Sequence, residues 1–159
     1  MAKPVTSEQV LDKLQALCNA AEHCRSEVAK RLAKVDLPAA EKSAILKRLV
    51  RDGFVDDARY ARAFAHDRLR FSLWGRFKIA LALRAKQIDK EHIDDALEAL
   101  DEEEYRQVAR RVVRSAFARC KRDEDGAIPY PERLKAFRRA AAHGFETNVI
   151  KTCISEFNL

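Results

Sequence analysis

The sequence is poor in residues that interrupt helices, because glycine and proline occur only four times each in 159 residues. It also has no apolar run of membrane-spanning length, and its first nine residues lack a charged segment followed by an apolar one. These absences argue against a turn-rich sheet protein, a transmembrane helix and a secretory signal. We therefore expect an all-α protein that works in the cytoplasm, without a membrane.

Motifs of enzymes and metal centres are also missing. The four cysteines form no Cys-x-x-Cys pair and no set at zinc-ligand spacing, and the four histidines are scattered over separate predicted helices. There is no glycine-rich phosphate loop, no Gly-x-Ser-x-Gly and no His-Glu-x-x-His. We expect no catalytic residues, no cofactor and no metal, and we expect the cysteines to stay reduced and pack as small apolar side chains. They are Cys18, Cys24, Cys120 and Cys153.

Apolar residues recur every three or four positions along almost the whole sequence, which is the spacing of one helix face. Thr6 and Gln9 fit a capping box ahead of the first helix. The stretch from Arg122 to Pro131 contains Asp125-Gly126 and two prolines, and it predicts a loop. We expect nine helices, with apolar stripes over residues 10–21, 28–35, 44–49, 60–69, 79–83, 93–100, 105–120, 134–142 and 148–157.

One apolar spacing occurs three times, each time where the second of three helices meets the third. Residues at positions i, i+4 and i+9 are Val28, Leu32 and Leu37, then Ile79, Leu83 and Ile88, then Ala136, Ala140 and Phe145. A repeat of this length predicts tandem three-helix modules in an elongated array, covering residues 1–51, 52–102 and 103–159. Coincidence is the alternative, since any pair of helices joined by a turn can place apolar residues at such spacings.

The net charge of +6 conceals a strong segregation of charge along the chain. Residues 59–86 hold eight Lys or Arg and one acid, and residues 105–122 hold seven and none. Between these basic blocks, residues 88–104 hold nine acids and one lysine. The pattern predicts a polyanionic partner on one surface and a basic partner on another. The alternative is that neighbouring helices neutralise each other.

The most informative segment runs from Leu46 to Leu97. It contains Gly53, which permits the left-handed turn that ends a helix, followed by Asp56 and Asp57, which can cap the next one. Its first half reads Leu46-x-x-Leu49-x-x-x-Gly53-Phe54-Val55-Asp56-Asp57-x-x-Tyr60-Ala61-x-x-Phe64. Its second half reads Trp74-Gly75-x-x-Lys78-Ile79-x-x-x-Leu83-Arg84-x-Lys86-x-Ile88-x-x-x-x-Ile93-x-x-Ala96-Leu97.

In order and spacing, this segment resembles the RecX family of recombination regulators. The resemblance continues at lower density over most of the chain and leaves out only about the first twenty residues. The family it resembles is also built from tandem three-helix repeats. Two departures stand out: Gln87 replaces a usual glycine, so we expect strain in the turn before Ile88, and Arg76 replaces a frequent proline.

The resemblance implies regulation by binding rather than catalysis. It implies that the RecA recombinase filament on single-stranded DNA is the partner, and that the protein limits filament growth, ATP hydrolysis, strand exchange and coprotease activity. It places the protein in DNA repair and the SOS response. An open-ended array needs no symmetric partner, so we expect a monomer.

The basic blocks supply the candidate contacts to the filament or its DNA. In the middle module these are Arg68, Arg70, Trp74, Arg76, Lys78, Arg84 and Lys86, and in the last module Arg110, Arg111 and Arg114. Positions 76, 78, 84 and 86 do not share one helix face, so we expect some of them to meet solvent only. For Trp74 we favour packing between helices over stacking on a base.

Two other functions remain open. A stand-alone DNA-binding protein would explain the basic helices and the pI near 9.3, and it would affect a recombinase only by covering its DNA. A helical scaffold for another protein would explain the segregated charges and would have no affinity for DNA. Inhibition of the recombinase at ratios well below one molecule per subunit distinguishes a filament regulator from both.

Overall fold

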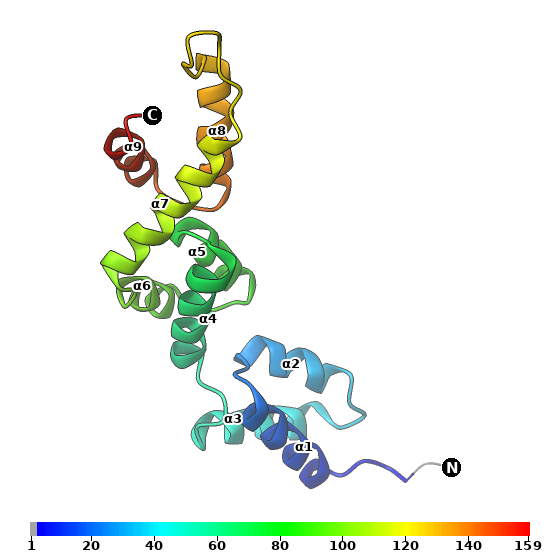
Figure 1. Ribbon diagram of the computed structural model, residues 1–159. Coiled ribbons are helices and arrows are strands. Elements are labelled where there is room, and N and C mark those ends of the chain that lie inside the picture. The colour runs from blue at the N-terminus through cyan, green and yellow to red at the C-terminus, as the bar shows by residue number, and fades with distance from the viewer. Residues whose placement is uncertain (1–2) are drawn as a thin grey trace.

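The computed structural model describes residues 3–159 and shows an elongated row of helices, with α1–α3 at one end and α7–α9 at the other (Figure 1). Over these residues the chain forms nine helices and no strand, which confirms the predicted all-α fold. The helices are α1 (Ser7–Ala20), α2 (Arg25–Ala33), α3 (Ala39–Arg51), α4 (Asp57–Ser72), α5 (Arg76–Ala85), α6 (Lys90–Glu98), α7 (Glu102–Ala118), α8 (Tyr130–Ala142) and α9 (Thr147–Glu156).

Local signals in the sequence set several helix ends. The Thr6 side chain accepts a hydrogen bond from the Gln9 backbone N–H at 3.2 Å, and the Gln9 side chain accepts one in return, so the capping box is confirmed. Asp56 caps α4 by accepting from the Arg59 N–H at 3.0 Å. Gly53 has φ +79°, in the left-handed region that favours glycine. Gln87 also lies in this region, with φ +59°, so the strain expected there is present.

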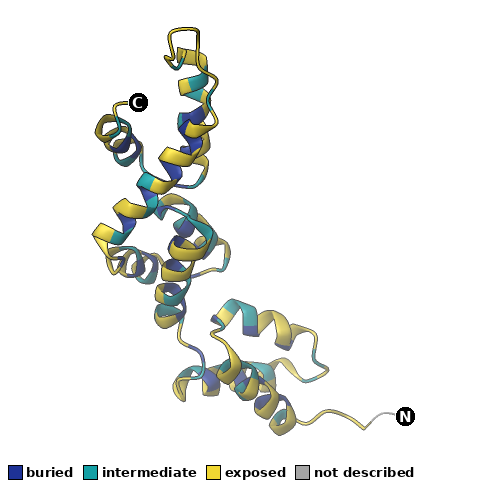
Figure 2. Cartoon of the chain, in the orientation of Figure 1, coloured by how far each residue is buried: buried dark blue, intermediate teal, exposed yellow. Residues whose placement is uncertain are grey.

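The apolar side chains gather into two cores rather than three. Helices α1–α3, the first triplet, enclose one core with Val55 added to it. The second triplet, α4–α6, and the third, α7–α9, share a single continuous core. Figure 2 shows the buried residues on the helix faces that turn toward neighbouring helices. Because this second core is undivided, module boundaries at residues 51 and 102 stay a prediction.

The repeated i, i+4, i+9 positions lie inside these cores. Eight of the nine residues are buried, and Leu37 is partly buried against the first core. The second and third sets, centred on Leu83 and Ala140, belong to the shared core. The four cysteines are free thiols, with Cys24 and Cys153 buried and the other two partly buried. In the described part of the chain, no helix is both long enough and apolar enough to cross a membrane.

Candidate interaction surface

The turn between α4 and α5 carries the tryptophan that the sequence singled out. Leu73 ends α4 in the left-handed region with φ 57°, and the Trp74 ring then lies edge-on to Phe64, 6.4 Å between centroids. The Arg68 guanidinium lies 5.0 Å and the Lys78 ammonium 4.8 Å from the Trp74 ring centroid. We call Arg68, Trp74 and Lys78 the Trp74 cluster. Two cations already lie against the ring, so a stacked base would have to displace one of them.

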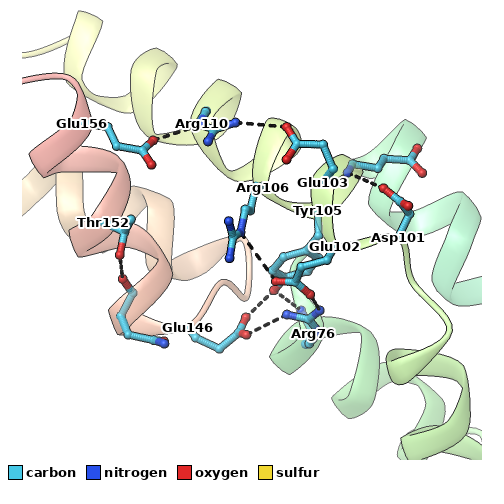
Figure 3. Close-up of polar contacts among 12 residues, drawn as sticks. Arg76, Asp101, Glu102, Glu103, Tyr105, Arg106, Arg110, Glu146, Thr152 and Glu156 are labelled. Carbon is cyan, nitrogen blue, oxygen red and sulfur yellow. Dashed lines mark hydrogen bonds and ion pairs between the residues drawn. The ribbon is translucent and has the colours of Figure 1, made fainter.

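Arg76, two positions from Lys78, lies at the centre of a network inside the chain (Figure 3). Its guanidinium pairs with Glu102 at 2.7 Å and Glu146 at 3.1 Å, and it lies 3.8 Å from the Tyr105 ring centroid. The Arg76 backbone N–H donates to the Tyr105 hydroxyl at 3.0 Å, and that hydroxyl donates to Glu146. Burial and the bond to Glu146 raise the pKa of Tyr105. These contacts join α5 to α7 and to the turn before α9.

Three further candidates are also neutralised within the chain. Arg70 pairs with Glu104, Lys86 with Glu27 at 3.4 Å, and Arg110 with both Glu103 at 3.5 Å and Glu156 at 2.9 Å. Glu104 belongs to the acidic block at residues 88–104 and lies on α7, whereas Arg70 lies on α4, so neutralisation between helices accounts for part of the charge pattern. Such partly exposed pairs contribute about 0–1 kcal/mol each to stability.

Five candidates have no carboxylate within salt-bridge distance anywhere in residues 3–159. They are Arg68, Lys78, Arg84, Arg111 and Arg114. Lys78 is partly buried against Trp74 and the other four are exposed. Arg114 lies over the Phe157 ring, 4.4 Å from its centroid. The structure thus divides the predicted cations into a neutralised set and a free set.

Exposed apolar residues on α5 were missed by the sequence reasoning. Phe77 is 63% and Leu81 65% exposed, although Ile79 and Leu83 between and beside them are fully buried. The signal was available, because positions 77 and 81 lie on the opposite helix face from 79 and 83. Arg84 continues the same face one turn later. We call Phe77, Leu81 and Arg84 the α5 ridge.

Side chains suited to a metal are not gathered at this surface. Across the residues that the structure describes, no three His, Cys, Asp or Glu side chains are grouped so that they could hold an ion. The free cations and the α5 ridge give this surface cationic and apolar contacts, which suit binding to a polyanion or a protein.

A comparison with known proteins identifies the family. The family model described as "RecX, second three-helix domain" matches residues 56–97, the region of α4–α6. The regulatory protein RecX of Mycobacterium ulcerans (strain Agy99) is 33% identical over 126 residues, which are 79% of this chain and 73% of the relative. The chain belongs to the RecX family.

Other RecX proteins support this assignment. Regulatory protein RecX of Xanthomonas axonopodis pv. citri (strain 306) is 32% identical over 130 residues, covering 82% of this chain and 76% of the relative. The crystal structure of RecX from Lactobacillus salivarius superposes with a TM-score of 0.82 at 20% identity, covering 96% of each chain. At that identity the match shows a shared fold. The RecX resemblance and the helical-repeat fold predicted from the sequence are thereby confirmed.

Proposed function

We propose that this RecX-family protein binds the RecA filament on single-stranded DNA and limits its growth, ATP hydrolysis, strand exchange and coprotease activity. One observation carries the proposal. Five cations with no carboxylate partner in residues 3–159 and an exposed apolar ridge are distributed over the second and third triplets of an elongated array. A chain that neutralises four neighbouring cations yet leaves these five free has surface available for a partner of opposite charge.

The proposed contact set follows from the same division. In the second triplet it comprises the Trp74 cluster and the α5 ridge, and in the third triplet Arg111 and Arg114. Arg70, Arg76, Lys86 and Arg110 would instead hold the helices in the shape that presents this surface. We propose that the chain acts as a monomer whose modules, residues 1–51, 52–102 and 103–159, make several modest contacts that add up through multivalency.

The α5 ridge offers the sharpest test. Phe77→Ala/Leu81→Ala removes two exposed apolar side chains, so the core is spared while a central interface anchor is removed. We expect the concentration needed for half-maximal inhibition of RecA ATP hydrolysis on single-stranded DNA to rise about tenfold, the effect of losing roughly 1.4 kcal/mol of binding. Tyr130→Ala is the matched control, because Tyr130 is 75% exposed at the start of α8, away from this ridge.

The stoichiometry of the wild-type protein tests the proposal itself. Inhibition at ratios far below one molecule per RecA subunit supports a filament regulator. Inhibition that begins only when the DNA is saturated would instead indicate a stand-alone DNA-binding protein. If Tyr130→Ala weakens inhibition as much as the ridge variant does, the ridge is not part of the interface.

A further inference from the structure

Helices α7 and α8 lie side by side and leave a pocket of about 210 Å³, of which the proposed contact set includes only Arg111. Its wall includes Arg111, Arg119, Arg139 and His143, together with the Ser115 hydroxyl. Among residues 3–159, no carboxylate lines it. Of these residues, only Arg111 was among the contacts predicted from the sequence.

The helical spacing explains how these groups meet. Arg111, Ser115 and Arg119 follow one another at four-residue intervals along α7 and its C-terminal cap, so they lie on one side over about 12 Å. Arg139 and His143 are also four residues apart, at the end of α8. Both rows line the pocket, so guanidinium, hydroxyl and imidazole groups border a space large enough for a phosphate group.

The arginines of this pocket have no structural partner. None of the three lies within salt-bridge distance of a carboxylate in residues 3–159, although Arg106 and Arg110, on the same helix as Arg111, are both ion-paired. Gathering unpaired like charges works against folding. A bound anion would remove that cost, and guanidinium groups match the geometry of phosphate oxygens.

His143 is held in place beside the arginines. Its Nδ1 donates to the Leu73 carbonyl at 2.9 Å, which fixes the ring and leaves Nε2 for another partner. Leu73 also lines the pocket and directly precedes Trp74. The pocket in the third triplet therefore adjoins the Trp74 cluster in the second.

The same boundary is closed by a tight backbone contact. A Cβ atom placed on Gly144, the residue after His143, would stand 2.4 Å from the Lys78 Cβ. Lys78 thus lies against the turn that carries His143, so this turn separates the pocket from the Trp74 cluster by only a few residues. Two neighbouring groups of cations suit a polymer of phosphates better than a single small anion.

We infer that the α7–α8 pocket binds a backbone phosphate of single-stranded DNA, with the strand continuing toward the Trp74 cluster. A free nucleotide fits less well, because no described residue of the pocket wall offers an aromatic ring on which a base could stack, apart from the His143 imidazole that the Leu73 carbonyl holds. The inference deepens the proposed function. It rests on that function in one respect, because we take the bound strand to be the DNA of the filament.

The test measures binding of a fluorescent oligothymidylate to the full chain without RecA, by anisotropy at several salt concentrations. Arg111→Gln/Arg139→Gln removes one arginine from each side of the pocket. Arg106→Gln/Arg138→Gln removes the same charge from the same two helices but outside the pocket. We expect the affinity of the pocket variant to fall about tenfold or more, and its salt slope to decrease by about 0.7 for each phosphate that is no longer neutralised.

The control variant should bind no more than about twofold more weakly than wild type. Both variants should remain folded, and the pocket variant should melt no lower than wild type because two unpaired charges are removed. Equal losses of affinity in the two variants would show that only net charge matters and would overturn the inference. Competition by inorganic phosphate or ATP at concentrations similar to those of oligothymidylate phosphate would show a small-anion site instead, and would also overturn it. If the pocket variant fails to bind DNA while the wild-type protein never inhibits RecA, the pocket stands and the filament proposal falls.

Discussion

The first triplet joins the second through polar contacts, whereas the second joins the third through a shared core and touching backbones. At the first joint, the Ser26 hydroxyl donates to the Lys86 carbonyl at 2.6 Å, and the Arg25 N–H donates to the Asp57 carboxylate at 2.8 Å. Arg59 pairs with Glu22 at 2.7 Å. A pocket of about 460 Å³ remains between these elements. Cys24, fully buried, is the one residue of α1–α3 or their connecting turns whose side chain belongs to the core of α4–α9.

The second joint is much closer. Gly75 donates its N–H to the His143 carbonyl at 2.7 Å, and the Phe77 N–H donates to the Gly144 carbonyl at 3.0 Å. A Cβ on Gly75 would stand 2.5 Å from Gly144 backbone atoms. The Arg76 and Tyr105 network then covers the contact (Figure 3).

The difference implies two kinds of mechanical behaviour. Apart from the buried Cys24 side chain, the first joint is held by exposed ion pairs and single hydrogen bonds that contribute about 1 kcal/mol each, so it should open at a lower cost than the second joint. The second joint can open only by breaking an apolar core, so α4–α9 should move as one body. A partner bound to α4–α9 would contact a rigid surface, whereas the first triplet could change its orientation relative to that surface.

Breaking the second joint should produce the largest effect. In Gly144→Ala the new methyl group would overlap Lys78, and the φ of +94° is strained for alanine, so we expect a loss of about 3 kcal/mol or more in the free energy of unfolding. Gly126→Ala is the matched control, with φ +81° but no described neighbour within 4 Å, and should cost about 1 kcal/mol. Urea unfolding followed by circular dichroism measures both. Similar losses would mean that backbone strain alone, and not the close approach, matters at Gly144.

A change at the first joint should lower the free energy of unfolding by less, and the size of the loss should depend on pH. Burial raises the pKa of Glu27, but hydrogen bonds from His23, Tyr60 and Cys24 and the charge of Lys86 outweigh it and bring the pKa to about 2. The ordinary value is 4.5, so the stabilisation is present above pH 4.5 and disappears as the pH falls toward 2.

We therefore expect Glu27→Gln to lower the free energy of unfolding by about 1 kcal/mol at pH 6, after allowance for solvent screening, because the carboxylate that accepts these bonds and pairs with Lys86 is gone. Near pH 2 the difference from wild type should shrink, since the wild-type side chain is then becoming protonated. Urea unfolding at both pH values measures this. Glu124→Gln, in the exposed loop before α8, serves as the control and should differ little from wild type at either pH. A pH-independent difference for Glu27 would contradict the assigned pKa.

The smallest effect concerns strain at the edge of the first joint. Gln87 has φ +59°, where glycine carries no steric penalty, and its side chain is exposed. Gln87→Gly should stabilise the chain by about 0.5 kcal/mol, because relief of strain outweighs the greater freedom of glycine in the unfolded state. Thermal unfolding of the two proteins side by side measures the gain. A lower melting temperature would show that the glutamine side chain makes a stabilising contribution.

Particular residues show how far the sequence could be interpreted. The Thr6 capping box, the Asp56 cap and the turn at Gly53 were all predicted, because each depends on residues within a few positions of one another. The buried anchors Ile79 and Leu83 were predicted for the same reason. The exposure of Phe77 was missed, although the helical period places it opposite those anchors.

Which of the basic side chains form ion pairs could not be predicted in this way. Arg76 and Lys78 are two positions apart on one helix, yet Arg76 is neutralised by Glu102 and Glu146 whereas Lys78 meets no carboxylate in the described chain. The pocket that brings Arg111 to Arg139 likewise joins residues from two helices.

By itself, then, the sequence determined the nine helices of the described chain, their caps and the faces they bury, since these follow from hydrogen bonds and apolar spacing within a turn or two of helix. The tertiary structure alone decided which cations are neutralised and which stay free, and where one triplet is fixed to the next. The physical reason is distance. An ion pair or a backbone contact forms only when packing brings together atoms that are 26 or 70 positions apart, as it does for Arg76 with its two carboxylates.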